Sequence, residues 1–422
     1  MPRCSRTTFA NGDGAASVSA KDMSGAGTEE QREDALTFLK GHHVWLLAFG
    51  TGGMVANIYY IQPLLSTIAA AFRITVSMVG VVAMLSQLGT ALGMLVFVPL
   101  GDTKERRSLM VRLAIVASLC LTFMATAHGF WWLAFASFGV GLTGSTVHVI
   151  IPYAADLAHP EHRSNIVGTV LSGLLLRILL ARALSGLMGA WFGWRSMYWL
   201  AAVLMLIIVT SFHFGLPRSL PPVKMSWLAP ICSAGDLVRR QATLREAALL
   251  GAVFFGSFSA FWTTLIFFLQ HPPYHYGSGV AGLFGLVGAV GAAAAPMIGR
   301  MADRYGARGN VLLALVVTLV SFVVLYTVGT KIAGLIAGVI LLDFGVQAGH
   351  ISNQTRIYAL LPEARSRMNM VYMISYFTAG SICSFIGTIA WEHFGWAGVC
   401  SFGGMLLVLG LTHPVFYGEH GA

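Results

Sequence analysis

Residues 217–246 read PRSLPPVKMSWLAPICSAGDLVRRQATLRE, and this polar stretch divides an otherwise apolar chain into two halves. Its four prolines and its clustered basic residues make it too polar to cross a membrane. Of the 422 residues, 56% are hydrophobic and only 10% are charged, whereas soluble domains have about 25% charged residues. This composition excludes a soluble globular protein and a disordered chain, and it predicts a protein that crosses a membrane many times.

Six apolar runs precede this stretch and six follow it. Each run approaches or exceeds the ~20 residues that a helix needs to cross a ~30 Å hydrocarbon core. The runs fall at 44–70, 76–100, 109–128, 130–157, 164–191, 194–216, 247–270, 276–298, 310–330, 332–358, 367–391 and 395–417. The predicted fold is all-α, with twelve transmembrane helices in two pseudo-symmetric six-helix bundles. The predicted segments are a disordered cytoplasmic tail at 1–42, a first bundle at 43–216, a cytoplasmic loop at 217–246, a second bundle at 247–417 and a cytoplasmic tail at 418–422.

The distribution of lysine and arginine predicts the orientation of the chain. Of the 26 basic residues, 20 fall on one set of alternate loops that includes both tails and the central stretch. The opposite loops contain only Arg73, Arg195 and Lys331. Because cytoplasmic loops are enriched in Lys and Arg, both termini are expected in the cytoplasm. The net charge of +9 is then explained by topology, and nucleic-acid binding is not expected.

The two halves share short motifs at a nearly constant offset. PEHRS at 160–164 recurs as PEARS at 362–366, and FGW at 192–194 recurs as FGW at 394–396, both 202 residues later. His148 and His350 are separated by the same 202 residues. Two such halves with both termini on one side form parallel repeats, an arrangement in which the substrate site lies near the middle of the membrane between the halves.

The stretch PMIGRMADRYGAR at 296–308 resembles the loop signature of the major facilitator superfamily. Five residues match the signature, namely Gly299, Asp303, Arg304, Gly306 and Arg308. The first-half copy, VFVPLGDTKERRSLM at 96–110, keeps Asp102, Arg106 and Arg107. The resemblance covers roughly 43–417 and implies a transporter that works by alternating access. Further stretches, such as QLGTALGMLVFVPLGD at 87–102, resemble a bacterial subgroup of drug- or sugar-efflux-like proton antiporters of the inner membrane.

The chain also departs from this pattern. Val98, Thr103 and Glu105 stand where the first-half signature prefers glycine, a basic residue and glycine. The fourth span has no early arginine, and the fifth has no Gly-Pro pair, although both are common in proton-coupled or drug-exporting members.

The loop residues of the signature have two interpretations. Asp102 and Asp303 lie at junctions of span and loop, where a carboxylate can accept backbone N–H groups of a neighbouring helix. In the functional interpretation, they and the basic residues after them form a cytoplasmic latch that breaks during transport. In the alternative, the charged residues only cover a cytoplasmic turn.

Polar residues within the tenth span form the most informative pattern. A charged side chain at the centre of a transmembrane helix costs ~2.5–3.5 kcal/mol, so Asp343 requires a reason. At 100° per residue, Asp343, Gln347, His350 and Gln354 share one narrow face. We expect this face to line a cavity used for proton coupling, although interhelical hydrogen bonding alone could explain the glutamines.

Other polar and aromatic residues are candidates for the lining of the same cavity. These are His148, Asn57, Tyr60, Trp262, Asn369 and Tyr372. An intramembrane histidine can instead be a structural hydrogen-bonding group, and aromatic residues near span ends can anchor the helix at the interface. The five cysteines have no metal-ligand spacing, and neither a metal nor a cofactor is expected.

Arg177 is the predicted partner of Asp343. It falls near the middle of the fifth span, whereas Arg182 lies about 7.5 Å further out. A pair of opposite charges at one depth would lower the cost of burying each. In the alternatives, Arg177 reaches toward polar lipid or bonds backbone carbonyls.

The sequence predicts a secondary transporter of the bacterial inner membrane, present as a monomer, that exports a small molecule in exchange for protons. Uptake symport or uniport of a sugar or other organic solute is the alternative. A membrane-embedded enzyme is disfavoured because no nucleophile–base set and no phosphate-binding loop is present.

Overall fold

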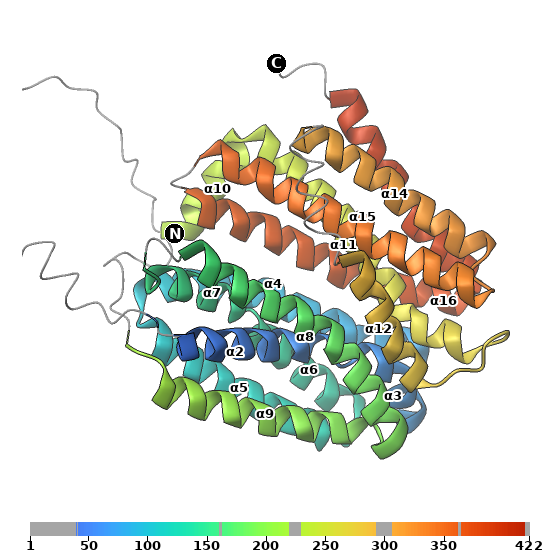
Figure 1. Ribbon diagram of the computed structural model, residues 1–422. Helices are drawn as coiled ribbons and strands as arrows, with labels where there is room; N and C mark the ends of the chain where they lie inside the picture. The colour runs from blue at the N-terminus through green and yellow to red at the C-terminus, as the bar shows by residue number, and fades with distance from the viewer. Residues whose placement is uncertain are drawn as a thin grey trace, which may run out of the picture.

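The chain folds into two bundles of α-helices that lie side by side (Figure 1). The structure is a computed structural model that describes residues 39, 41–159, 163–218, 229–292, 306–361 and 364–417. No strand occurs in these ranges. Of the predicted tail at 1–42, residues 1–38 and 40 lie outside the described residues, whereas Gly41 and His42 begin the first helix. The predicted tail at 418–422 also lies outside the described residues.

The first bundle has six spans, of which the first and fourth are each interrupted by a short irregular turn. Its elements are α2 (Gly41–Tyr59), the 3₁₀ helix η1 (Gln62–Leu64), α3 (Leu65–Phe72), α4 (Val76–Thr103), α5 (Arg106–Ala125), α6 (Phe130–Gly144), α7 (Val147–Asp156), α8 (Arg163–Phe192) and α9 (Trp194–Gly215). The segment 41–72 forms the first span, and α6 with α7 forms the fourth.

A short amphipathic helix in the central segment, α10 (Ala229–Arg240), precedes the second bundle. The elements of the second bundle are α11 (Ala242–Gln270), α12 (Ser278–Ala292), α14 (Ala307–Thr327), α15 (Ile332–Leu360) and α16 (Arg365–Tyr417). In the described ranges, nine helical segments are long and apolar enough to cross a membrane. The segment 365–412 is broken at Gly395 and holds two spans, while α8 and the shorter apolar α12 complete the set. The prediction of twelve helices is confirmed.

The repeated Phe-Gly-Trp motif has a backbone explanation. Gly193 and Gly395 occupy the same place in the two halves, and their φ angles are +81° and +60°. Side chains other than glycine rarely adopt this conformation, so each half needs a glycine for the tight turn between its last two spans. The motif therefore marks corresponding helix junctions.

The ends of the helices gather into two groups. At one end, Arg107 donates to the carbonyl of His213, and the Tyr153 hydroxyl donates to the carbonyl of Pro217 at 2.7 Å. We call this the basic end, because it also holds Arg106 and Arg356. At the opposite end, Arg195 donates to the carbonyl of Ala127 at 2.8 Å, and Tyr274 donates to the carbonyl of Gly329 at 2.7 Å.

The outward surface is strongly apolar. Phe214 is 81% exposed near the basic end, and Trp131 and Trp191 are 68% and 72% exposed near the opposite end. Leu119 and Leu206 are more than half exposed between them. Large apolar side chains with aromatic residues near both ends are typical of a surface that faces lipid.

The two bundles contact each other chiefly through α4 against α16 and through α8 against α12. The α8–α12 contact depends on glycine, since a Cβ at Gly282 would lie 2.5 Å from the carbonyl oxygen of Arg182. A Cβ at Gly186 would lie 2.3 Å from the carbonyl oxygen of Ser278. Small residues let helix backbones approach closely, and here they bring Arg182 to the boundary between the bundles.

The orientation of the chain can be tested with reporter fusions. A reporter that works only in the cytoplasm should be active when it is inserted within 219–228 or fused after Tyr417, because the basic end is expected to face the cytoplasm. The matched control is an insertion at 328–331, which should leave the same reporter inactive. Activity of an exclusively periplasmic reporter in the central segment would contradict this topology.

Candidate functional site

Arg182 of α8 is buried at the boundary between the two bundles. Its side chain is only 2% exposed, and its Nε donates a hydrogen bond of 2.7 Å to Oε1 of Gln62. The guanidinium carbon lies 3.8 Å from the ring centre of Trp262 on α11 and 5.1 Å from that of Tyr59 on α2. Aromatic faces attract cations, so these rings partly replace the water that the guanidinium has lost.

Asp343 of α15 is buried in the same region and is 4% exposed. The helix α12 makes room for it with two glycines. A Cβ at Gly288 would lie 3.0 Å from the carboxyl carbon and both oxygens of Asp343, and a Cβ at Gly291 would lie 3.0 Å from its Cβ. The predicted placement of an acidic side chain inside the bundle therefore coincides with a local gap in the packing of α12.

Arg182 and Asp343 interact electrostatically, although they do not form an ion pair within 4.0 Å. Nη2 of Arg182 and Oδ2 of Asp343 are both buried without a hydrogen-bond partner. The indole N–H of Trp262 is the hydrogen-bonding group next to the Asp343 carboxyl group, although its geometry falls outside that of a normal hydrogen bond. Buried polar atoms are almost always hydrogen-bonded, so the unpartnered atoms of Arg182 and Asp343 make this cluster a candidate functional site.

The arginine in this cluster is Arg182 rather than the predicted Arg177. Asp343 is 11 residues from the first residue of α15, and Arg182 is 10 residues from the last residue of α8. Arg177 is 15 residues from that end, which places its backbone about 7.5 Å further toward the basic end. Arg177 is part of α8, and its side chain lies outside the described residues.

A second group of polar side chains lies toward the basic end. Nδ1 of His350 is 3.0 Å from the Tyr372 hydroxyl, and the His350 ring also contacts Tyr376 at a centroid distance of 5.0 Å. His148 of α7 interacts electrostatically with His350. The two histidines that correspond in the repeat therefore lie within electrostatic range of each other, on opposite bundles.

The remaining residues of the predicted stripe continue in the same direction. Nε2 of Gln354 donates to Oδ1 of Asn369 at 3.3 Å, which joins α15 to α16. Gln347 lies between Asp343 and His350 along α15 and is half-buried. Along α15, Asp343 and Gln354 are 11 residues apart, so the polar face extends for about 16 Å.

Asn57, a predicted lining residue of the first span, contacts the first bundle instead. Nδ2 of Asn57 donates to the sulfur of Met205 within the first bundle, at 3.4 Å. Asn57 and Tyr59 are two residues apart, or 200° around the helix, so only one of them can face the second bundle. That residue is Tyr59, whose ring faces Arg182. Tyr60 is 3% exposed, and its carbonyl accepts a hydrogen bond from Ser185.

A cavity adjoins the Arg182 cluster. Only about 10 Å³ of it can hold the centre of a water molecule, which is room for about one water. Both bundles contribute to its lining: Tyr59, Gln62 and Gln87 come from the first, and Phe255 and Phe377 come from the second. Oε1 of Gln87 accepts a hydrogen bond of 3.1 Å from Ser259, which links the bundles beside the cavity.

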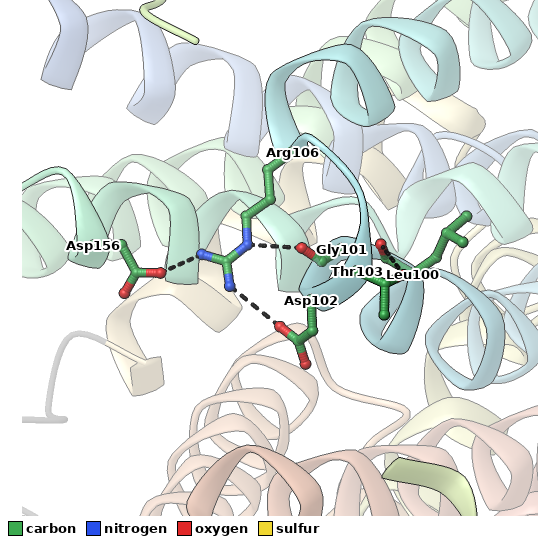
Figure 2. Close-up of polar contacts among 6 residues, drawn as sticks. All are labelled: Leu100, Gly101, Asp102, Thr103, Arg106 and Asp156. Atoms are coloured by element: carbon green, nitrogen blue, oxygen red, sulfur yellow. Dashed lines mark hydrogen bonds and ion pairs between the residues drawn. The ribbon is translucent and has the colours of Figure 1, made fainter. Parts of the chain in front are cut away.

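Arg106 organises the charged residues at the basic end of the first bundle (Figure 2). Its guanidinium contacts Asp156 of α7 at 2.5 Å and Asp102 of α4 at 3.2 Å, and its Nε donates to the carbonyl of Gly101 at 3.0 Å. Glu105 caps α5 by accepting the backbone N–H groups of Arg107 and Ser108. Glu105 therefore has a structural role at the position where the signature prefers glycine.

The second bundle has a different charged cluster. Glu246 of α11 binds Arg356 of α15 at 2.7 Å and lies 4.0 Å from Arg308 of α14. Gly306 precedes α14 with a φ angle of +76°, a conformation that favours glycine. The predicted latch residues Gly299, Asp303 and Arg304 lie outside the described residues.

Comparison with known proteins identifies the family. The model of the Major Facilitator Superfamily matches residues 47–383. The chain belongs to this superfamily. It is 39% identical over 366 residues to an Escherichia coli O157:H7 protein named "Uncharacterized transporter YgaY", a match that covers 87% of this chain and 93% of that protein.

More distant relatives agree with this assignment. The chain is 24% identical over 373 residues to the "Probable sugar efflux transporter" of Pasteurella multocida, with 87% of this chain and 90% of that protein covered. Among solved structures, the fold resembles that of a bacterial homologue of the human lysosomal transporter Spinster, with a TM-score of 0.68 and 16% identity over 89% of this chain and 94% of that one. The superfamily consists of transporters, and this chain is a multi-pass membrane transporter.

The contribution of Arg106 to the basic end can be measured with Arg106→Gln. The change removes contacts to Asp102 and Asp156, so it is expected to lower the apparent unfolding temperature of the purified protein, by an amount equivalent to about 1–3 kcal/mol. Arg112→Gln is the control, because Arg112 is exposed on the same helix. Equal unfolding temperatures for the two variants would contradict a stabilising role of Arg106.

The gap beside Asp343 predicts a second difference between variants. Gly288→Ala would place a methyl group 3.0 Å from the Asp343 carboxyl group, and overpacking of this kind typically costs about 1–3 kcal/mol. Gly279→Ala on the same helix meets its nearest atom at 3.6 Å, an ordinary contact. Gly288→Ala should therefore unfold at a lower temperature than Gly279→Ala. The reverse order would show that the carboxyl group is not held against α12.

Proposed function

We propose that this protein is a proton-coupled secondary transporter that moves a small organic molecule by alternating access, with Asp343 as the proton-binding group. The observation that carries the proposal is a buried carboxyl group between the two bundles, with one oxygen unpartnered, beside a buried arginine. Substrate sites of transporters with parallel repeats lie in this position.

The electrostatics of the cluster supply a coupling mechanism. When Asp343 is ionised, its charge offsets that of Arg182, and the cluster is close to neutral. When Asp343 binds a proton, the positive charge of Arg182 is left without compensation in an apolar interior. Such a change in charge costs free energy that depends on the surroundings, so proton binding can favour one arrangement of the bundles over another.

The charged cluster at the basic end suits a conformational latch. Arg106 joins α4, α5 and α7 within the first bundle, while Glu246 joins α11, α14 and α15 within the second. These contacts hold the helix ends of each bundle together in this conformation, and in our proposal they loosen during transport. We assign the basic end to the cytoplasm, and Asp102, Arg106 and Arg107 to the first-half side of the latch.

Two directions of transport have support. Export in exchange for protons is the direction predicted from the sequence, and it agrees with the name of the Pasteurella multocida relative. Uptake of substrate together with a proton is the second candidate. It is favoured by the Arg182–Asp343 cluster, because protonation of Asp343 makes the positive charge of Arg182 available to a substrate.

Asp343→Asn tests proton coupling in proteoliposomes. Because asparagine cannot bind the proton, the variant should lose accumulation of substrate driven by a pH gradient but keep exchange of labelled for unlabelled substrate. The candidate substrates are a panel of neutral, anionic and cationic organic solutes, and the readouts are uptake and internal pH.

Asp236→Asn is the matched control, because Asp236 is exposed on α10 and the chemical change is the same. It should behave like the wild type. Gradient-driven accumulation by Asp343→Asn at the wild-type level would refute Asp343 as the proton-binding group.

A further inference from the structure

The two contacts between the bundles are related by the internal repeat. We call them the α4–α16 seam and the α8–α12 seam. In the first, a Cβ at Gly80 would lie 2.2 Å from Oγ1 of Thr388. Gly282 and Gly186 occupy the corresponding positions, 202 residues away in each case, and a Cβ at Gly282 would lie 2.9 Å from Cα of Gly186. The two seams therefore bring equivalent faces of equivalent helices together.

The seams differ at the end opposite the basic end, which we call the outer end. The backbone N–H of Ser77, in the first turn of α4, donates to Oε2 of Glu392 on α16 at 2.9 Å. The corresponding pair in the other seam is Gly279 and Ala190, where a Cβ at Gly279 would lie 3.6 Å from that of Ala190. The same position of the repeat thus holds a polar contact in one seam and an ordinary apolar contact in the other.

The carboxylate of Glu392 completes the N-terminal cap of α4. The first four N–H groups of a helix have no partner within the helix, and they carry a partial positive charge. Oγ1 of Thr75 accepts the N–H of Met78, and Glu392 accepts that of Ser77. A residue of the second bundle therefore caps a helix of the first, so this contact can exist only while the two helices lie together at the outer end.

The outer contacts of the two seams also differ in their exposure to water. In the α8–α12 seam, Oγ of Ser278 donates to the carbonyl of Gly186 at 3.2 Å, and Ser278 is only 3% exposed. Glu392 is exposed, so water can solvate its carboxylate as soon as the contact with α4 breaks. A carboxylate that is held by the end of a helix and can be released into water is suited to a contact that forms and breaks repeatedly.

We propose that Glu392 is a latch that holds the outer end closed and releases α4 whenever this end opens. The latch belongs to the α4–α16 seam alone, because Ala190 at the corresponding position has no side-chain group that could cap α12. It is distinct from the latch assigned to the basic end, which includes Asp102. The inference rests on the proposed alternating access, and it is independent of the role of Asp343.

Chemical labelling of a buried cysteine tests the latch. Thr388 is 0% exposed and lies one turn from Glu392, so Thr388→Cys should react only when the outer end opens. The five native cysteines are replaced by alanine, and the reagents are applied to the outer side of right-side-out membrane vesicles. Glu392→Gln keeps the shape of the side chain but removes its charge. It should raise the labelling rate about two- to fivefold, which corresponds to the usual strength of a charge at a helix N-terminus.

Two methanethiosulfonate reagents of opposite charge separate opening from local electrostatics. Removing a negative charge near the cysteine would by itself speed the reaction with a sulfonated reagent and slow that with a trimethylammonium reagent. These two effects cancel in the geometric mean of the two rates, whereas opening of the seam raises that mean. An unchanged geometric mean in Glu392→Gln would overturn the latch.

Two controls exclude less specific explanations. Lys331→Gln also removes an exposed charge from the outer end, and Thr388→Cys should then be labelled at the wild-type rate. A chain that keeps Cys400 as its only cysteine reports on the last span away from the latch, since Cys400 is 3% exposed. Equal acceleration at Cys400 in Glu392→Gln would show a general loosening of the fold and would overturn the latch.

Failure of the latch is distinguishable from failure of the proposed function. An unchanged labelling rate in Glu392→Gln refutes the latch, and it leaves the proton site to the transport assay of Asp343→Asn. The absence of labelling at Thr388→Cys in every variant would show that the outer end stays closed. That result would contradict alternating access as well as the latch.

Discussion

The burial of one arginine and one carboxyl group between the two bundles is the constraint on which the functional arrangement depends. Each charge removed from water costs on the order of several kcal/mol, and attraction between opposite charges repays this only with good geometry. Here the compensation is partial. Gln62 and the face of Trp262 hold Arg182, two glycines of α12 make room for Asp343, and one polar atom of each side chain has no partner. Such incomplete pairing contributes little to the stability of the fold, and it leaves polar atoms able to bond a proton or a ligand.

Most of the fold could be predicted from the sequence, because the bilayer imposes strong rules. Span length follows from the thickness of the hydrocarbon core, and the two glycines of the Phe-Gly-Trp repeats follow from a turn that needs a positive φ. The helix α10 was missed because the central segment was judged only by whether it could cross the membrane. Its twelve residues, Ala229–Arg240, are too short and too polar for a span but suffice for a helix.

The site could be predicted only in part, because periodicity gives the face of a helix but not its neighbours. The polar face from Asp343 to Gln354 could be predicted from the periodicity of one helix alone. In the structure, residues of this face bond side chains of another helix. To predict the partner of Asp343, the depths of residues on two different helices must be compared. Counting residues from the middle of each span selects Arg177. Counting from the end opposite the basic end, where α8 ends and α15 begins, selects Arg182. Asp156 was missed as a partner of Arg106 because it lies 50 residues away on α7.

The charged pair also breaks the internal symmetry that the rest of the chain keeps. At the offset of 202 residues, Arg182 corresponds to Ser384 and Asp343 corresponds to Gly141. Ser384 bonds Thr263 within the second bundle, and a Cβ at Gly141 would lie 1.7 Å from the carbonyl of Ser86, so neither position could take the charged side chain without rearrangement. His148 and His350, in contrast, occupy corresponding positions of the repeat and interact electrostatically across the boundary. Each bundle therefore contributes one charge that the other lacks. Because the two charges belong to different bundles, a relative movement of the bundles changes the distance between them. Their electrostatic interaction energy therefore changes with that movement. The energy of the movement then depends on the proton and the ligand that are bound between the bundles.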